Sequence, residues 1–314
     1  MQTKPKSTVD HITVWCQRDE WAQQQQWRFM HTHSQPHHWL IILNDDQPLW
    51  NKRVRHWIRT QLITQQPKSQ LTVTVMSLND FPVIRKRTHN DNLLHGYWRQ
   101  QLLKLRAAHC YGSPRLVITD SKTWPVRSWH PHTLPRYLLD DAKTSVFWHN
   151  AERMRIKLGV DTAWHTHWPS VLPPVIWHRT WVEHMLKEWR SFDEFLDWAI
   201  HHDQFPDYTG QCTTMMSEFM LVEAHRQLTN THTTDQHSEN PNFCFPQKHV
   251  DLLNKWAEGS HSQKELRQDL HSHPAWNSQR FVTIKWHDPT HGGNLFLNDH
   301  MRNRVADMLL CCND

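Results

Sequence analysis

Glycine is scarce in this sequence: only 7 of the 314 residues are Gly. Neither a Gly-x-Gly-x-x-Gly fingerprint nor a Gly-x-x-x-x-Gly-Lys-Ser/Thr loop occurs anywhere in the chain. In both motifs the glycines let the backbone approach phosphate groups closely. The sequence therefore argues against a dinucleotide-binding Rossmann domain and against a P-loop NTPase.

Long apolar runs and paired cysteines are also missing. No stretch approaches the roughly 18 apolar residues of a transmembrane helix, and the N-terminus lacks the apolar region of a signal peptide. The six cysteines form no Cys-x-x-Cys pair, which argues against a zinc ribbon and gives no disulfide framework. We expect a cytoplasmic protein with free thiols and no membrane span.

Charge of one sign is not in large excess, since 35 Lys and Arg face 31 Asp and Glu for a net charge of +4. This mild basicity suits a phosphate-bearing ligand but does not require nucleic acid. The 28 histidines include no His-Glu-x-x-His metal motif. The 19 tryptophans, which each bury about 200 Å², offset a low mean hydropathy of -0.78 and supply enough core.

Strand-like and helix-like segments alternate over residues 1–125. We expect strands at 11–16, 39–43, 69–80 and 114–122, and helices at 20–33, 50–63 and 96–110. This alternation predicts an α/β fold with a mostly parallel sheet flanked by helices. Ligands of such sheets bind at the carboxyl ends of the strands, and every predicted strand here ends in polar residues.

The second part of the chain is predicted from weaker patterns. Residues 144–149 are expected to form a short strand, 181–202 a helical region, and a further helix starts near Thr213 or Thr214. A late strand at 279–288 and a closing helix at 297–310 follow. The absence of a repeat or a linker indicates one domain, 1–314, with a helical C-terminal lobe.

Asp120-Ser121-Lys122 ends the fourth predicted strand, within "SPRLVITDSKTWPV". A carboxylate at this position can hold Mg²⁺ or Mn²⁺, which bind oxygen ligands and bridge substrate phosphates. Lys122 can bring a positive charge to the same phosphates. A surface turn with a solvated lysine would have the same sequence, so both interpretations stay open here.

The block from "HGYWRQQLLKLRAA" to the Asp120 triplet resembles an uncharacterised, glycosyltransferase-like family of bacterial and phage proteins with the GT-A nucleotide-diphospho-sugar transferase fold. The resemblance is carried by Gly96, Tyr97, Trp98, Gln100, Gln101, Leu103, Lys104 and Leu105, followed by Asp120-Ser121-Lys122. The segment "MSEFMLVEAH" is similar to the family's Ser-Glu-Tyr helix start and aligns Ser217 and Glu218, and "RFVTIKWHD" resembles its last strand and aligns His287.

This resemblance implies a Rossmann-like, GT-A-like sheet with a nucleotide-binding half, 1–127, and an acceptor-side, helical half, 128–314. It implies that Glu218 and Asp120 are catalytic, Glu218 as the base for an acceptor hydroxyl. It implies a divalent metal, Mn²⁺ or Mg²⁺, on Asp120 and His287. The implied substrate-binding residues are Asp19, Asp45, Asp46, Gly96, Trp98, Gln100, Gln101, Lys104, Ser121, Lys122 and Ser217.

One position departs from the family pattern, because Lys122 stands where the Asp-x-Asp metal motif has its second acid. Lys122 therefore either leaves the metal to Asp120 and His287 or replaces it. We expect a glycosyltransferase that uses a nucleotide-diphosphate sugar and an unknown acceptor, which is a glycan, a lipid-linked glycan or a modified DNA base. The alternatives are an inactive nucleotide-sugar-binding protein, favoured by the incomplete motif, and a nucleic-acid-binding module that uses "NKRVRHWIR" and "IRKRTH".

Overall fold

The structure is a computed structural model. It describes residues 8–35, 37–65, 71–91, 96–134, 136–140, 145–160, 167–169, 174–200, 217–229, 237–238, 242–244, 262–272, 281–283 and 299–311.

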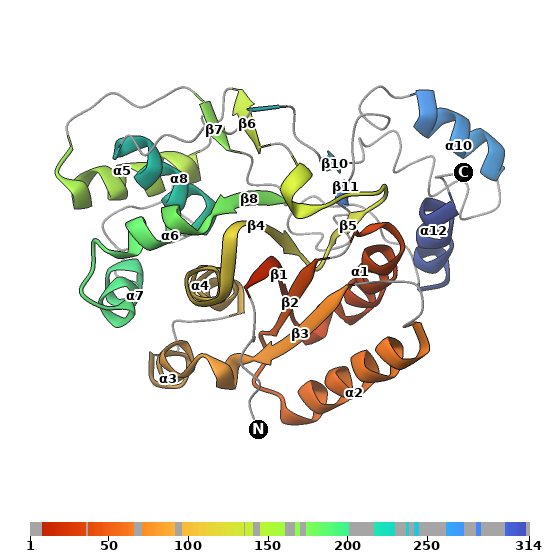
Figure 1. The fold of residues 1–314 in the computed structure, drawn as a ribbon, viewed down its shortest axis with the longest axis horizontal. Coiled ribbons are helices and arrows are strands. Elements are labelled where there is room, and N and C mark those ends of the chain that lie inside the picture. Colours follow the sequence, from red (N-terminus) through yellow and green to blue (C-terminus); the bar gives the residue numbers. More distant parts are fainter. Residues whose placement is uncertain are drawn as a thin grey trace.

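A five-stranded sheet forms the centre of the molecule, in the order β3-β2-β1-β4-β8 (Figure 1). Its strands are β1 (Val9–Trp15), β2 (His38–Leu43), β3 (Thr72–Ser77), β4 (Gly112–Asp120) and β8 (Val175–His178). The first four are parallel and β8 runs antiparallel to β4 at the edge. The predicted α/β class with a mostly parallel sheet is therefore confirmed.

Helices cover both faces of this sheet, as the alternation predicted. One face carries α1 (Glu20–His33) and α2 (Pro48–Gln65). On the other face, α4 (Gly96–Tyr111) and α6 (Arg179–Leu186) pack against the strands. The same core also contains side chains of α3 (Pro82–Asp91), α5 (Ser145–Leu158), α7 (Phe192–Ile200) and α8 (Glu218–Leu228).

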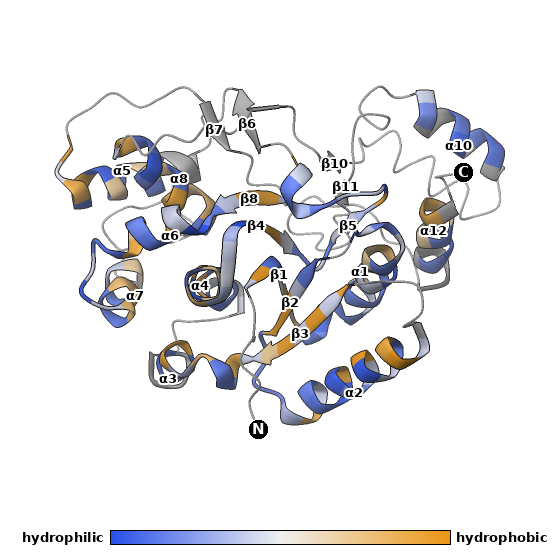
Figure 2. Ribbon diagram, in the orientation of Figure 1, coloured by the Kyte–Doolittle hydropathy of each residue, from blue (hydrophilic) through white to orange (hydrophobic). Residues whose placement is uncertain are grey.

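Successive side chains of the central strands enter opposite cores. Leu40 and Ile42 pack in the core between the sheet and α4, whereas Trp39 and Ile41 pack in the core between the sheet and α1. All six residues of β2 are buried, as expected for a central strand covered on both faces. Figure 2 shows this as strands that are largely hydrophobic beside helices that carry both hydrophobic and hydrophilic residues.

A tight junction joins α4 to β4 at Gly112. A Cβ atom at this position would lie 2.5 Å from the carbonyl oxygen of Ala108, so only glycine fits without a shift of the backbone. Gly112, the predicted stop of the helix, therefore fixes the angle at which β4 starts toward Asp120.

Smaller elements lie beside the central sheet. One three-stranded sheet contains β5 (Thr123–Pro125), β10 (Asn242–Cys244) and β11 (Phe281–Thr283), and another contains β6 (Arg136–Asp140), β7 (His167–Pro169) and β9 (His237–Ser238). Two further helices are α10 (Gln263–Ser272) and α12 (Asp299–Cys311). Helix α12 contacts α1 through Trp21 with Asn303 and Arg28 with Asp307. In the described part of the chain, no helix combines the length and apolar character needed to cross a membrane.

Three sequence expectations differ from the structure. Residues 145–149 belong to helix α5 and not to a strand, because the helical period continues and places Ala151 and Met154 in the core against neighbouring helices. Helix α8 begins at Glu218, later than expected, since Ser217 before it has extended backbone angles. The edge strand β8 was not predicted at all.

Candidate functional site

The candidate site lies where the strand order of the sheet reverses. β1 continues along the chain to β2 and β3 on one side, whereas β4 pairs with β1 on the other side. Such a switch point, at the carboxyl ends of β1 and β4, is where open α/β sheets bind ligands. Asp120, the last residue of β4, lies beside Val14 near the end of β1.

A cavity of about 490 Å³ opens at this edge. Its lining comes from the segments after β1 and β2 and from the first turns of α4: Cys16, Gln17, Arg18, Asn44, Asp45, Gly96 and Gln100. The volume lies within the range of small-molecule and cofactor sites. The predicted substrate residues Asp45, Gly96 and Gln100 thus share one cavity.

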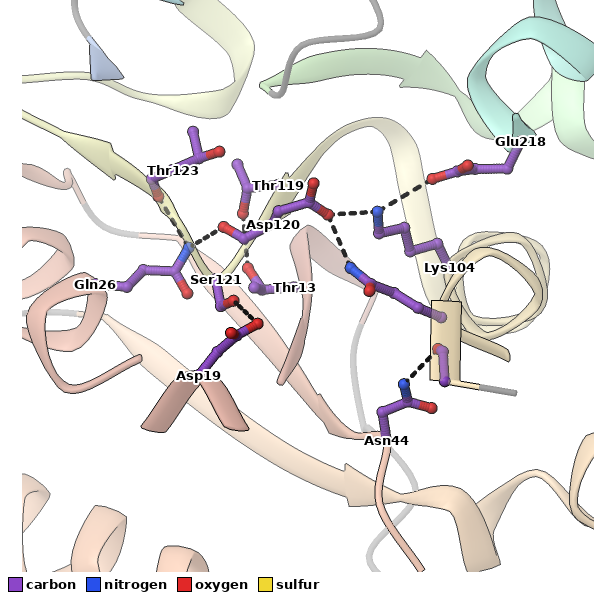
Figure 3. A network of polar contacts seen from close by, with 12 residues as sticks. Thr13, Asp19, Gln26, Asn44, Lys104, Thr119, Asp120, Ser121, Thr123 and Glu218 are labelled. Atoms are coloured by element: carbon purple, nitrogen blue, oxygen red, sulfur yellow. Dashed lines mark hydrogen bonds and ion pairs between the residues drawn. The ribbon is translucent and has the colours of Figure 1, made fainter. Parts of the chain in front are cut away.

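Asp120 is held by two side chains of α4 (Figure 3). Its Oδ1 atom accepts hydrogen bonds from Lys104 Nζ at 2.6 Å and from Gln100 Nε2 at 3.0 Å. Gln100 and Lys104 share one helix face because they are four residues apart, as the sequence predicted. The Asp120 side chain remains 36% exposed, so α4 fixes the carboxylate and leaves part of it open to a ligand.

Lys104 connects Asp120 to a second carboxylate. Its side chain is 1% exposed, and its Nζ lies 3.1 Å from Glu218 Oε1 at the first residue of α8. Burial alone would lower the pKa of Lys104, but Asp120 and Glu218 outweigh this and raise it, so the ammonium stays charged. Burial and the negative charge of Asp120 raise the pKa of Glu218, although Lys104 opposes this shift.

The end of β4 is anchored from the opposite side by Gln26 of α1. Its Nε2 donates to the carbonyl oxygens of Asp120 and Thr123, at 2.9 and 3.0 Å. Its Oε1 accepts from Trp15 Nε1 at 2.9 Å. Gln26 therefore uses both ends of its amide to set where the Asp120 turn leaves the sheet (Figure 3).

Lys122, the unusual residue of the triplet, pairs with Asp19 after β1. Its Nζ lies 3.3 Å from Asp19 Oδ1. The other oxygen, Oδ2, accepts from Cys16 Sγ at 3.2 Å and, at the longer distance of 3.5 Å, from Ser121 Oγ. Burial and Asp19 raise the pKa of the Cys16 thiol to about 12, so Cys16 is a poor nucleophile.

The other predicted residues are placed differently from one another. The Asp45 carboxylate accepts a hydrogen bond from the backbone N–H of Gln17. Asp46, the next residue, is half-buried and is not among the residues that line the cavity. Trp98, 7% exposed, and the buried Gln101 lie on the covered side of α4, which leaves little surface for a sugar. Ser217 is the residue before α8, and its backbone N–H donates to Asn150. His287 lies outside the described residues.

Sequence reasoning did not select several residues of the cavity. Arg18 and Gln17 follow β1, and Asn44 follows β2 and donates to the Gly96 carbonyl at 2.9 Å. Arg99 donates to Asn44 Oδ1 at 2.7 Å and thereby stiffens the cavity wall. Their signal was present, because Gln17, Arg18 and Asn44 belong to the same polar strand ends as Asp19 and Asp45.

The carboxylates described at the Asp120 edge are not arranged as a divalent-ion site, and the second expected ligand, His287, lies outside the described residues. Mg²⁺ and Mn²⁺ need oxygen ligands, but Asp120 Oδ1 and Asp19 Oδ2 already accept hydrogen bonds from donor groups, and the ammonium donor of Lys122 lies 3.3 Å from Asp19 Oδ1. Two of these donors, Lys104 and Lys122, carry positive charge. Within the described ranges, no three side chains of His, Cys, Asp or Glu come together as a metal site.

Three of the seven Lys and Arg residues in the basic runs that suggested a nucleic-acid module lie beside acids. Arg53 pairs with Glu20 at 2.6 Å, Arg55 lies 3.7 Å from Asp80, and Arg87 pairs with Asp197. Exposed pairs of this kind leave less free charge for phosphates than the sequence runs suggest.

No family model matches this chain, and no curated protein matches it in sequence. Similar solved structures include the apo form of the glycosyltransferase GlyE from Streptococcus pneumoniae TIGR4, at 8% identity and a TM-score of 0.42 over 96% of this chain. LgtC, a galactosyltransferase solved with donor and acceptor sugar analogs, has 10% identity and a TM-score of 0.44 over 96% of this chain and 95% of its own. The bifunctional glycosyltransferase WbbM has 10% identity and a TM-score of 0.44 over 92% of this chain. This chain spans 64% of GlyE and 47% of WbbM. At these identities the likeness concerns the fold alone.

Proposed function

We propose that this protein transfers a sugar from a nucleotide-diphosphate sugar to a hydroxylated acceptor. The observation that carries the proposal is the cavity at the switch point of the sheet, where the lining residue Gln100 donates a hydrogen bond to the part-exposed carboxylate of Asp120. The sequence resemblance of the block from Gly96 to Lys122 gives the same reaction class independently.

The side chains that line the cavity suit a nucleotide-diphosphate sugar. Arg18 brings a guanidinium group, which recognises phosphate oxygens by paired hydrogen bonds. Asn44 and Asp45 bring amide and carboxylate groups that can bind the polar edges of a base or a ribose. The Asp120 carboxylate, held by Gln100 and Lys104, can accept hydrogen bonds from sugar hydroxyls.

In the proposed reaction, the bond between the anomeric carbon and the diphosphate oxygen breaks while the acceptor oxygen bonds to that carbon. The diphosphate leaves with the bond's electron pair, and a cation must stabilise its growing negative charge. Arg18 and Lys122 are the positively charged groups that we assign to this role. The acceptor hydroxyl must lose its proton to a base.

Glu218 is the predicted base, and two of its properties point in different directions. Burial raises its pKa, which suits a group that takes up a proton. Its side chain is only 1% exposed, so an acceptor reaches it only after neighbouring side chains move. Its contact with Lys104 gives Glu218 a positioning role in either case.

The test is a thermal-shift screen of nucleotides and nucleotide sugars on the wild type, Asp120→Asn and Arg18→Ala. Saturation to a hundred times Kd stabilises the folded state by about 2.7 kcal/mol. We expect one nucleotide sugar to stabilise the wild type and both variants to lose much of this shift. The exposed residues Asp193 and Arg59 provide matched controls, Asp193→Asn and Arg59→Ala.

Hydrolysis or transfer of the ligand found in this screen then separates the two leading functions. Turnover that is lost in Asp120→Asn supports the transferase. Binding without turnover under any acceptor condition would instead favour a nucleotide-sugar-binding protein, for which the neutralised carboxylates Asp19 and Asp120 would be the structural reason. No binding at all would reject both.

A further inference from the structure

Two carboxylates at the Asp120 edge are each paired with a lysine. Asp120 lies 2.6 Å from Lys104 Nζ, and Asp19 lies 3.3 Å from Lys122 Nζ. A divalent-ion site requires the opposite arrangement, in which carboxylate oxygens point at a shared empty space. Here the ammonium group of a lysine lies beside each carboxylate instead.

Lys122 does more than compensate a buried charge. The Asp19 side chain is 7% exposed, whereas that of Lys122 is 23% exposed, so Lys122 is the more accessible member of the pair. An ammonium group has three donors. Because the Lys122 side chain is part-exposed, these donors can reach a ligand that approaches from the solvent.

Arg18 adds a second positive charge beside the same acid. It is the residue before Asp19 in the turn that follows β1, and it lines the cavity. Lys122 approaches Asp19 from the end of β4. Together the two side chains carry the +2 charge that a divalent ion would bring.

We propose that Lys122, together with Arg18, takes the place of a divalent metal ion, so that the site binds a nucleoside diphosphate without Mg²⁺ or Mn²⁺. The diphosphate part of this inference rests on the proposed function. The exclusion of the ion rests only on the pairs Lys122–Asp19 and Lys104–Asp120. The two parts can therefore fail separately.

The first arm of the test uses the metal ions alone. Lys122→Asp restores an Asp-x-Asp triplet and leaves Asp19 beside two other acids, so Mn²⁺ should raise its melting temperature by roughly 5 °C near saturation. The wild type should not respond to Mn²⁺ or Mg²⁺. Lys52→Asp on the exposed face of α2 makes the same change of charge and should not respond either.

A second variant guards against a folding defect in Lys122→Asp, because Asp19 is buried. Lys122→Asn introduces an oxygen ligand without a new charge, and we expect it to respond to Mn²⁺ more weakly but in the same direction. Circular dichroism checks that each variant is folded. If the wild type is stabilised by Mn²⁺ as strongly as the variants, or if no variant responds, the inference is wrong.

The second arm measures UDP and GDP affinity by calorimetry in EDTA and in excess Mn²⁺. We expect the wild type to bind one of them equally well in both buffers, and Lys122→Asp to bind it only with Mn²⁺. Loss of wild-type affinity in EDTA would overturn the inference. If neither nucleotide binds in either buffer, the diphosphate role of Lys122 is rejected together with the proposed function, whereas the first arm still decides whether Lys122 excludes the ion.

Discussion

Thr119 and Asp120 are adjacent on β4, yet their side chains enter two buried polar clusters of different character. The neutral cluster, on the α1 side of the sheet, consists of His11, Thr13, Trp39 and Thr119. The charged cluster, on the α4 side, consists of Gln100, Lys104, Asp120 and Glu218. Both clusters depend on the pairing of β1 with β4.

The neutral cluster is held by hydrogen bonds between its own members. Thr119 Oγ1 lies 2.6 Å from His11 Nε2 and 2.7 Å from Thr13 Oγ1, and Trp39 Nε1 donates to Thr13 at 3.1 Å. Burial lowers the pKa of His11, so the ring is neutral. Every member is buried, and the cluster serves the packing of the sheet.

The charged cluster is buried at one end and exposed to solvent at the other. Lys104 and Glu218 are buried, but Asp120 reaches the surface at the end of the strand. The comparison teaches that burial of polar groups alone does not mark a site. A site needs a polar group that is held rigidly and still presents an open face to a ligand.

The largest predicted effect concerns Lys104, which only the charged cluster requires. Lys104→Met leaves Glu218 buried without its partner, and such losses typically cost 3–5 kcal/mol. We expect about 3 kcal/mol from urea denaturation, because solvent screens the part-exposed Asp120. Lys52→Met should cost nothing measurable, and adding Glu218→Gln to Lys104→Met should recover stability. A loss below about 1 kcal/mol would mean that Lys104 does not hold the cluster together.

The second prediction is a pH dependence that comes from the histidine beside the neutral cluster. Burial lowers the pKa of His37, whose ring packs near His11, from 6.5 to about 4, although Asp10 opposes the shift. Below pH 6.5 the unfolded chain binds more protons, so stability is present above pH 6.5 and is lost as the pH falls toward 4. Between about pH 7.5 and pH 5 this histidine alone should account for about 2 kcal/mol.

Urea denaturation at both pH values measures this loss. His37→Gln should reduce the loss by about 2 kcal/mol, since glutamine does not titrate. The pH dependence that remains comes from other buried histidines with lowered pKa values, such as His11 and His33. Glu218 acts in the opposite direction, because its raised pKa favours the folded state at low pH. A variant with the same pH slope as the wild type would show that His37 is not the source.

The third prediction separates the two neighbours on β4. Thr119→Val keeps the shape of the side chain but removes the hydroxyl that binds His11 and Thr13, at a cost of about 1.5 kcal/mol. Nucleotide-sugar affinity should not change, because Thr119 faces away from the cavity. Asp120→Asn should show the reverse pattern, with weaker binding and a smaller loss of stability. Equal effects of both variants on affinity would contradict the division into two clusters.

The smallest effect on stability is expected for Glu218→Gln. Glutamine keeps an oxygen for Lys104 and removes a buried charge, so the free energy of unfolding should change by less than about 1 kcal/mol. Turnover then distinguishes the two roles of Glu218. Loss of kcat with unchanged donor binding indicates the base, whereas retained kcat indicates that Glu218 only positions Lys104.

The sequence by itself determined the local elements and the edge at which the site forms. Alternating and helical periods located β1, β2, β3 and β4 with α1, α2 and α4 between them, because these patterns reflect burial on one or two faces. Helix α3 was not predicted. The polar residues after each strand predicted the cavity edge, and the spacing of Gln100 and Lys104 placed them on one helix face. The roles assigned to these residues remain predictions.

Only the tertiary structure decided how the charges pair. Lys104 meets Glu218 across 114 positions of the chain, and Lys122 meets Asp19 because β4 lies beside β1. Neither contact has a local signal, since pattern and spacing report neighbours along a helix or strand and not across the fold. The strand expected at 144–149 failed for another reason, because that short segment did not include the helical period that continues to Ala151 and Met154. The sequence therefore specified which charged residues stand at the strand ends, and the packing of distant elements decided which of them remain open to a ligand.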